Sequence, residues 1–137
     1  MKEVYTKDIH PSIRKLLSFA TSELKVDREY DTYMKFTNRK LFGYELNGIF
    51  VGCIGIEMIS SKECIIKHIA VSPEQREKGI GSKMINVLSE QFLFISAETD
   101  KDAVDFYRKY GFVVTSLGEK YPGVERFKCK YRNKRDY

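Results

Sequence analysis

The chain has 137 residues, of which 42% are hydrophobic and 31% are charged. This length and balance fit one globular domain and argue against a disordered chain. No apolar run is long enough to cross a bilayer, and the N-terminus lacks the charged-then-apolar pattern of a signal peptide. We therefore expect a cytoplasmic protein with no membrane partner.

Three cysteines, Cys53, Cys64 and Cys129, lie in apolar, strand-like runs without Cys-x-x-Cys spacing. We expect buried free thiols in a reducing compartment, not disulfides or metal ligands. The net charge of +5 favours an anionic partner such as a phosphorylated cofactor, an acidic protein or nucleic acid. The basic segment 128–135 is interpreted as the polar face of a last strand with a solvated end. A patch for nucleic acid or an acidic partner is the alternative.

The first elements in the chain are a strand and two helices. A short strand is predicted from Val4 to Thr6. Pro11 opens a helix, because proline suits the first helical turn. Asp27 is a candidate N-cap for a second helix, which would end at Asn38 or Arg39.

An antiparallel meander is predicted next. Strands at 41–46 and 49–59 are joined by Asn47-Gly48, the strongest short hairpin signal. A turn at 60–62 leads to a strand at 63–71, whose nearly continuous apolar run indicates a central position.

The second half alternates strands and helices. A helix starts at about Gly79, a strand follows at 92–97, and a helix at 100–110 ends at Gly111. Strands at 112–116 and 126–131, joined through a loop at 118–123, close the chain. The order β-α-α-β-β-β-α-β-α-β-β indicates an α+β domain with a mixed, mostly antiparallel twisted sheet of about seven strands and about four helices.

The turn after the strand at 63–71 has the composition of an anion site. The first N–H groups of a helix have no intrahelical partner, and the helix dipole adds partial positive charge there. Gly79 and Gly81 would let an anion approach the backbone, and Arg76 and Lys78 add charge. The turn therefore predicts phosphate binding. It lacks the ending of a P-loop and the third glycine of a dinucleotide fingerprint.

Two blocks flank this turn. The first is Ile66-Lys67-His68-Ile69-Ala70-Val71-Ser72-Pro73, followed by Arg76-x-x-Gly79-x-Gly81, and the second is Asp100-Lys101-Asp102-Ala103-Val104-Asp105-Phe106-Tyr107-Arg108-Lys109-Tyr110-Gly111-Phe112. At these residues the sequence resembles motifs A and B of the GNAT superfamily of N-acetyltransferases. The order of elements also fits that family, so the resemblance spans nearly the whole chain. It implies a single GNAT-like N-acetyltransferase domain over residues 1–137.

The resemblance implies an acetyl-CoA site without a metal. Ile69, Ala70 and Val71 would pair through their backbone with the pantetheine arm, like an added strand. The pyrophosphate would be held by backbone N–H groups of Arg76, Glu77, Lys78, Gly79, Ile80, Gly81 and Ser82. The second block would complete the cofactor site with Asp100, Ala103, Phe106 and Tyr107, although Phe106 also fits a packing role.

Two residues of the second block, Asp100 and Tyr107, each have two possible roles. Asp100 stands where the family often has Asn, and an ionised carboxylate accepts hydrogen bonds but cannot donate them. A helix N-cap is the other interpretation of Asp100. Tyr107 matches the family's general acid, which protonates or hydrogen-bonds the departing thiolate; a core aromatic is the alternative.

The general base is not evident. Relatives place Glu or His at positions that correspond to Ile65 and Lys67 here. His68 has a suitable intrinsic pKa, but strand alternation turns it to the other side of the sheet unless a bulge intervenes. Glu57 and Glu63 are further candidates through a water molecule. We expect a water relay rather than one named base.

The leading hypothesis is direct acetyl transfer from acetyl-CoA to a primary amine in a ternary complex. The acceptor, a small molecule or a protein amine, would lie between the first two helices and the 120–123 loop. A non-catalytic acyl-CoA sensor is the alternative. We expect a monomer or homodimer that does not bind nucleic acid.

Overall fold

The computed structural model describes residues 1–134 and resolves the predicted order of elements. In chain order the elements are β1 (Lys2–Val4), α1 (Pro11–Ala20), the short 3-10 helix η1 (Glu23–Lys25), α2 (Val26–Lys35), β2 (Arg39–Leu46), β3 (Ile49–Met58), β4 (Glu63–Val71), the 3-10 helix η2 (Pro73–Gln75), α3 (Ile80–Gln91), β5 (Phe94–Asp100), α4 (Val104–Tyr110), β6 (Val113–Tyr121) and β7 (Val124–Arg132). The predicted α+β class is confirmed.

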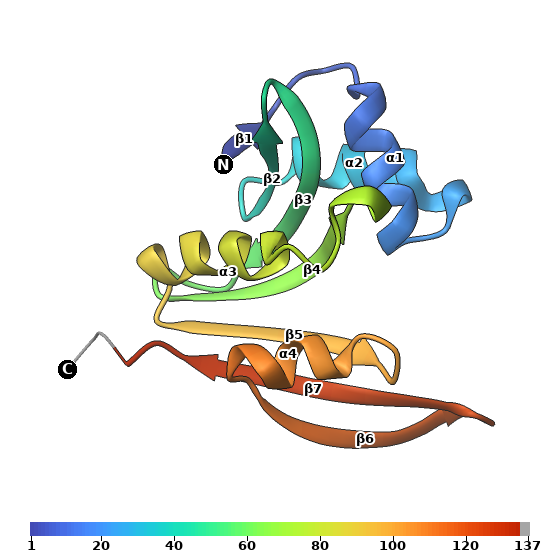
Figure 1. The fold of residues 1–137 in the computed structure, drawn as a ribbon, viewed down its shortest axis with the longest axis vertical. Coiled ribbons are helices and arrows are strands. Elements are labelled where there is room, and N and C mark those ends of the chain that lie inside the picture. Colours follow the sequence, from blue (N-terminus) through green and yellow to red (C-terminus); the bar gives the residue numbers. More distant parts are fainter. Residues whose placement is uncertain (135–137) are drawn as a thin grey trace.

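The strands form one seven-stranded sheet in the order β1-β2-β3-β4-β5-β7-β6. All neighbours run antiparallel except β4 and β5, which are parallel and are connected through α3. Pairing between β4 and β5 extends only from Glu63↔Phe94 to Ile66↔Ala97. Beyond Ile66 the two strands separate, and in Figure 1 β4 rises away from β5 toward its C-terminal end. The sheet is therefore open at its middle.

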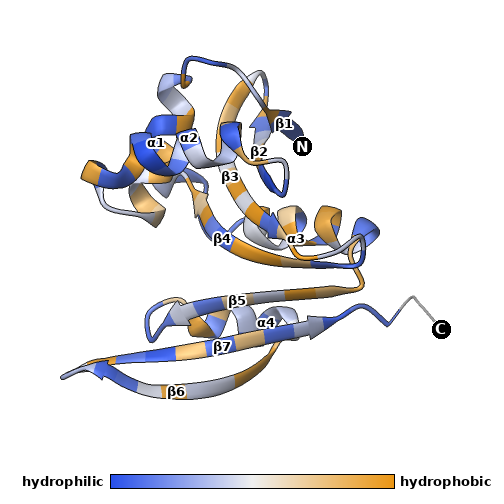
Figure 2. Ribbon diagram, turned by 180° about the vertical axis from the view of Figure 1, so that it is seen from behind, coloured by the Kyte–Doolittle hydropathy of each residue, from blue (hydrophilic) through white to orange (hydrophobic). Residues whose placement is uncertain are grey.

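Two apolar clusters cover the two faces of the sheet. One packs α3 and α4 against residues such as Ile54, Ile66 and Ile95. The other packs α1 and α2 against residues such as Leu41, Cys53 and Ala70. Figure 2 shows the apolar stretches of β3, β4 and β5 and the more hydrophilic β7. Strand β4, which borders the opening, therefore has helices packed on both of its faces.

Several predicted boundaries were wrong. The second helix begins at Val26 with Lys25 as its cap, and Asp27 lies in its first turn, where it pairs with Arg14. That helix ends at Lys35, before the predicted Asn38. The first strand ends at Val4 instead of beginning there, because it pairs with β2 from Lys2 onward.

The largest difference lies at the C-terminal end of the sheet. The predicted 118–123 loop belongs to a long hairpin in which β6 and β7 run to the two-residue turn at 122–123. Gly118 and Gly123 have φ of 81° and 79°, so they serve an irregularity in β6 and the turn itself. The basic segment was interpreted as part of a last strand, and residues 128–132 do lie in β7. Arg135, at the end of that segment, lies outside the described residues.

Candidate active site

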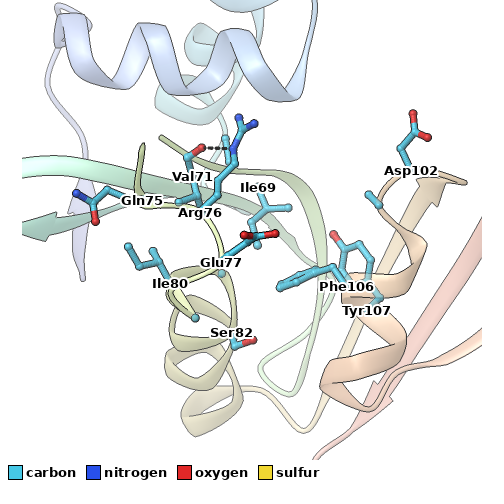
Figure 3. A pocket seen from close by; sticks show the side chains of 14 residues that line it. Ile69, Val71, Gln75, Arg76, Glu77, Ile80, Ser82, Asp102, Phe106 and Tyr107 are labelled. Atoms are coloured by element: carbon cyan, nitrogen blue, oxygen red, sulfur yellow. Dashed lines mark hydrogen bonds between the residues drawn. The ribbon is translucent and has the colours of Figure 1, made fainter. Parts of the chain in front are cut away.

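A groove of about 490 Å³ lies beside the end of β4, where β4 has separated from β5. Its wall comes from the end of β4, the turn before α3, the first turn of α3, and α4 (Figure 3). The lining residues are Ile69, Ala70, Val71, Gln75, Arg76, Glu77, Gly79, Ile80, Gly81, Ser82, Asp102, Ala103, Phe106 and Tyr107. The structure therefore brings the two sequence blocks together around one cavity, and of the predicted cofactor residues only Lys78 and Asp100 do not line it.

The turn into α3 exposes backbone N–H groups. Pro73 opens η2 directly after β4, and the chain then passes through Glu77 and Gly79, whose φ angles are 64° and 80°. A positive φ at Glu77 is uncommon for a residue with a side chain and marks a constrained backbone. Gly79 is the N-cap of α3 and provides no side-chain cap. The N–H groups of the first turn of α3 are thus available to an anion.

The side chain of Arg76 holds this turn against β4. Its Nε donates a hydrogen bond to the carbonyl of Val71 at 3.0 Å, and its guanidinium lies 5.2 Å from the ring centroid of Phe19 on α1. Figure 3 shows the bond to Val71 as a dashed line. Lys78 instead reaches Gln75, with 3.5 Å between Nζ and Oε1. Arg76 therefore connects the turn to both the central strand and α1.

Gly81 allows α4 to approach α3 closely. A Cβ at Gly81 would lie 2.9 Å from the Phe106 ring, closer than carbon atoms pack. Figure 3 shows Phe106 reaching from α4 toward the start of α3. A side chain at position 81 would displace Phe106 and change the shape of the groove.

Tyr107 has an apolar body and a free polar end. The residue is 4% exposed, and its ring lies 5.2 Å from that of Phe106 and 5.1 Å from that of Phe112, measured between centroids. Burial raises the pKa of the phenol above its ordinary value, and the neighbouring Cys129 adds to this. Within residues 1–134 the hydroxyl makes no hydrogen bond, although the residue lines the groove. A protonated donor therefore faces the cavity.

Asp100 serves the backbone. Its Oδ1 accepts hydrogen bonds from the N–H groups of Asp102 at 3.0 Å and Ala103 at 3.1 Å. Asp100 ends β5, where it pairs with Arg126, and the α4 helix begins only at Val104. The predicted helix start at 100 was wrong because β7 extends the strand. Asp100 is therefore not the N-cap of α4, which is Ala103, but its carboxylate caps the turn that precedes the helix. Gln75 and Asp102 line the groove but were not predicted; their places inside the two blocks were the available signal.

A bulge in β4 changes the positions of the candidate bases. In the β3–β4 ladder Gly55 pairs with His68 and Ile56 pairs with Ile66, so Lys67 is an extra residue in β4. Strand alternation, which would separate Lys67 and His68, is interrupted there. His68 contacts Tyr33 of α2. The bulge coincides with the end of the β4–β5 pairing.

Glu57 and Glu63 lie apart from the groove. The carboxylate of Glu57 is 3.9 Å from both Arg39 Nε and Lys67 Nζ. Glu63 stands at the far, paired end of β4 and borders a separate surface pocket with Phe94. None of the three candidate bases lines the groove.

Comparison with known proteins settles the family. A family model described as the acetyltransferase (GNAT) domain matches residues 37–114, more than half of the chain. The chain belongs to the GNAT acetyltransferase family. This membership confirms the predicted family, fold class and enzyme class, an acyltransferase of the acetyl-CoA-dependent type.

Three individual acetyltransferases resemble this chain in sequence or in fold. An uncharacterised N-acetyltransferase from the lysA 3′ region of Bacillus methanolicus is 29% identical over 89 residues, covering 63% of this chain and 74% of its own. A GNAT acetyltransferase from Elizabethkingia anophelis, solved with acetyl-CoA, is 20% identical with a TM-score of 0.71, covering 95% of each chain. An aminoglycoside 6′-N-acetyltransferase, solved with coenzyme A, is 15% identical with a TM-score of 0.79, covering 100% of this chain and 99% of its own.

Two kinds of feature are absent from residues 1–134. Across residues 1–134 no group of three or more His, Cys, Asp or Glu side chains is placed to hold a metal ion. Among the helices of the same segment, none is long and apolar enough to cross a membrane.

Proposed function

We propose that this GNAT protein transfers an acetyl group from acetyl-CoA directly to a primary amine. The observation that carries the proposal is the groove at the separated ends of β4 and β5, which leads to the uncapped start of α3. At Ile69–Val71 no strand pairs with the β5 side of β4. The Val71 carbonyl already accepts from Arg76, and the other backbone groups of this edge suit the amides of pantetheine. The N–H groups at the start of α3 suit a pyrophosphate. CoA carries both features, because its pantetheine arm contains amides and is joined to a pyrophosphate.

Tyr107 fits the departing sulfur. The amine nitrogen attacks the thioester carbonyl carbon, the C–S bond breaks, and the thiolate gains negative charge. Because burial raises the pKa of Tyr107 above its ordinary value, the phenol remains protonated and donates a hydrogen bond as that charge develops. The amine loses its proton to a water molecule, since none of Glu57, Glu63 and His68 lines the groove.

The cysteines favour direct transfer over an acyl-enzyme. No cysteine lines the groove, and burial raises the pKa of Cys53 and Cys64 to about 12. Such thiols are almost never ionised near neutral pH, so they are poor nucleophiles. The cysteines therefore favour a ternary complex of enzyme, acetyl-CoA and amine over an acylated thiol.

An amine panel tests the proposal. Purified protein is incubated with acetyl-CoA and small amines, polyamines, aminoglycosides, amino acids or peptides, and released thiol is measured. We expect at least one amine to raise thiol release well above the rate without amine. Thermal stabilisation by acetyl-CoA without any thiol release would favour a non-catalytic sensor. No stabilisation and no release would contradict the proposal itself.

A further inference from the structure

A partly buried hydrogen bond joins Tyr33 of α2 to His68 of β4. The Tyr33 hydroxyl lies 2.5 Å from His68 Nδ1. Gly55 on β3 leaves room for it, because a Cβ there would lie 2.0 Å from the Tyr33 hydroxyl. The bulge at Lys67 sets the position of His68 on β4. Helix α2 and strands β3 and β4 therefore together determine the position of this imidazole ring.

The direction of this bond follows from hydrogen-bond satisfaction. Tyr33 is 3% exposed, and within the described residues its hydroxyl has His68 Nδ1 as its one hydrogen-bond partner. If Nδ1 carried the proton and donated to Tyr33, the buried phenolic hydrogen would have no acceptor. Leaving a buried donor unsatisfied costs about 1–3 kcal/mol. Tyr33 therefore donates, Nδ1 accepts, and in the neutral ring the proton resides on Nε2.

The surroundings keep this ring neutral. Burial lowers the pKa of His68 from its ordinary value, and Lys67 and Arg39 act in the same direction while Glu29 opposes them. The neutral ring with Nδ1 as acceptor cannot take a proton at Nε2. His68 is thus a hydrogen-bond donor and not a general base in this arrangement.

Nε2 of His68 remains available. In the part of the chain that the structure describes, Nε2 has no hydrogen-bond partner, and no buried side-chain nitrogen or oxygen lacks one. Nε2 therefore reaches solvent. Its residue precedes Ile69, which lines the groove, and it lies on the face covered by α2. His68 is thus one residue along β4 from the groove wall, and its ring lies on the opposite face of the sheet from α4 and Tyr107.

We propose that His68 donates its Nε2–H to an oxygen of the acceptor, so that the enzyme selects amines carrying an oxygen close to the amino group. This inference rests on the proposed acetyl transfer. Tyr33 acts as a positioning residue that fixes the tautomer, and Gly55 provides its space. Amino alcohols, amino amides and peptide N-termini belong to the expected class; simple alkylamines do not.

Nitrogen-15 NMR of the free enzyme tests the tautomer without any substrate. We expect His68 to show a protonated Nε2 and an unprotonated Nδ1 in the wild type, and a mixture of tautomers in Tyr33→Phe. A proton on Nδ1 in the wild type would overturn the inference. This readout stands even if no acetyl transfer is found.

Two substitutions distinguish the loss of the Nε2–H donor from the loss of the hydrogen bond to Tyr33. In His68→Asn the side-chain oxygen replaces Nδ1 as the partner of Tyr33, but the Nε2–H is lost. In His68→Gln the amide N–H replaces Nε2–H, but Tyr33 loses its partner. Both variants are first checked for acetyl-CoA stabilisation equal to that of the wild type, so that failure of the cofactor site is recognised separately.

Kinetics then compare ethanolamine with n-propylamine, which differ by a hydroxyl in place of a methyl group. Because ethanolamine is the weaker base, kcat/KM is expressed per concentration of unprotonated amine. On that basis we expect the wild type to prefer ethanolamine by about tenfold, the usual scale of one hydrogen bond. His68→Asn should lose this preference through the KM of the amine, and His68→Gln should retain it. No preference in the wild type, an unchanged His68→Asn, or loss of kcat in both variants with normal KM would overturn the inference; the last result would make His68 a base.

Discussion

Gly79→Ala separates backbone strain from anion binding, because the chain has a matched control. Gly79 and Gly48 both have φ of 80°, and a Cβ at either position would meet no atom within 4 Å. Gly79 lines the groove, whereas Gly48 lies in the β2–β3 hairpin turn. An alanine in the left-handed region costs about 1–2 kcal/mol at either site. Both variants should therefore lose similar stability.

Their affinities for acetyl-CoA should differ. At position 79 the added methyl group stands where an anion would approach the N–H groups of α3. Losing one charge-assisted hydrogen bond costs about 1.5–3 kcal/mol, which weakens binding by about 10- to 150-fold. Calorimetric titration gives the affinities and thermal unfolding gives the stabilities. Equal affinities of Gly79→Ala and Gly48→Ala for acetyl-CoA would refute the role of this turn.

Four further predictions concern the side chains of Tyr107, Asp100, Cys53 and Cys64. Tyr107→Phe should lower kcat by about 10- to 100-fold and leave the acetyl-CoA affinity nearly unchanged; full activity would make Tyr107 a packing residue. Burial raises the pKa of Tyr107 from the ordinary value of 10.0, so the wild-type kcat should show no loss from phenol ionisation as the pH rises to 9.5. A kcat that already falls as the pH rises toward 9 in the wild type, but not in Tyr107→Phe, would contradict a raised pKa. Asp100→Ala should cost about 1 kcal/mol of unfolding free energy by removing the acceptor for the two N–H groups before α4, with denaturant unfolding as the measurement and an unchanged midpoint as the contrary result. Cys53 and Cys64, whose thiol pKa burial raises to about 12, should resist a thiol reagent at pH 8 in the native state and react in urea; rapid native labelling of either would show that its strand opens.

The local signals in the sequence were sufficient for much of the fold. Asn47-Gly48 forms the predicted hairpin with φ of 53° and 80°, and Gly111 ends α4 with φ of 122°. These positions depend on backbone conformations that few residues other than Gly and Asn adopt. The turn into α3 was also predicted, because Arg76, Gly79 and Gly81 lie close together in the sequence.

Other features depend on contacts between distant segments. The bulge at Lys67 arises from the pairing of β3 with β4, and no residue type in β4 predicts it. The bond between Tyr33 and His68 joins residues 35 positions apart and requires the absence of a side chain at Gly55. The length of the β6–β7 hairpin was hidden because its glycines resemble loop residues. Tertiary pairing overrides local preference in each case.

Initial rates with both substrates varied test the central claim, direct transfer of acetyl from acetyl-CoA to an amine, most directly. Thiol release and N-acetylated product, measured by absorbance and mass spectrometry, should appear in equal amounts. The double-reciprocal lines should intersect, as a ternary complex requires, and the protein mass should show no acetyl group. Parallel lines with an acetylated protein, or acetyl-CoA binding without any amine-dependent thiol release, would contradict the account.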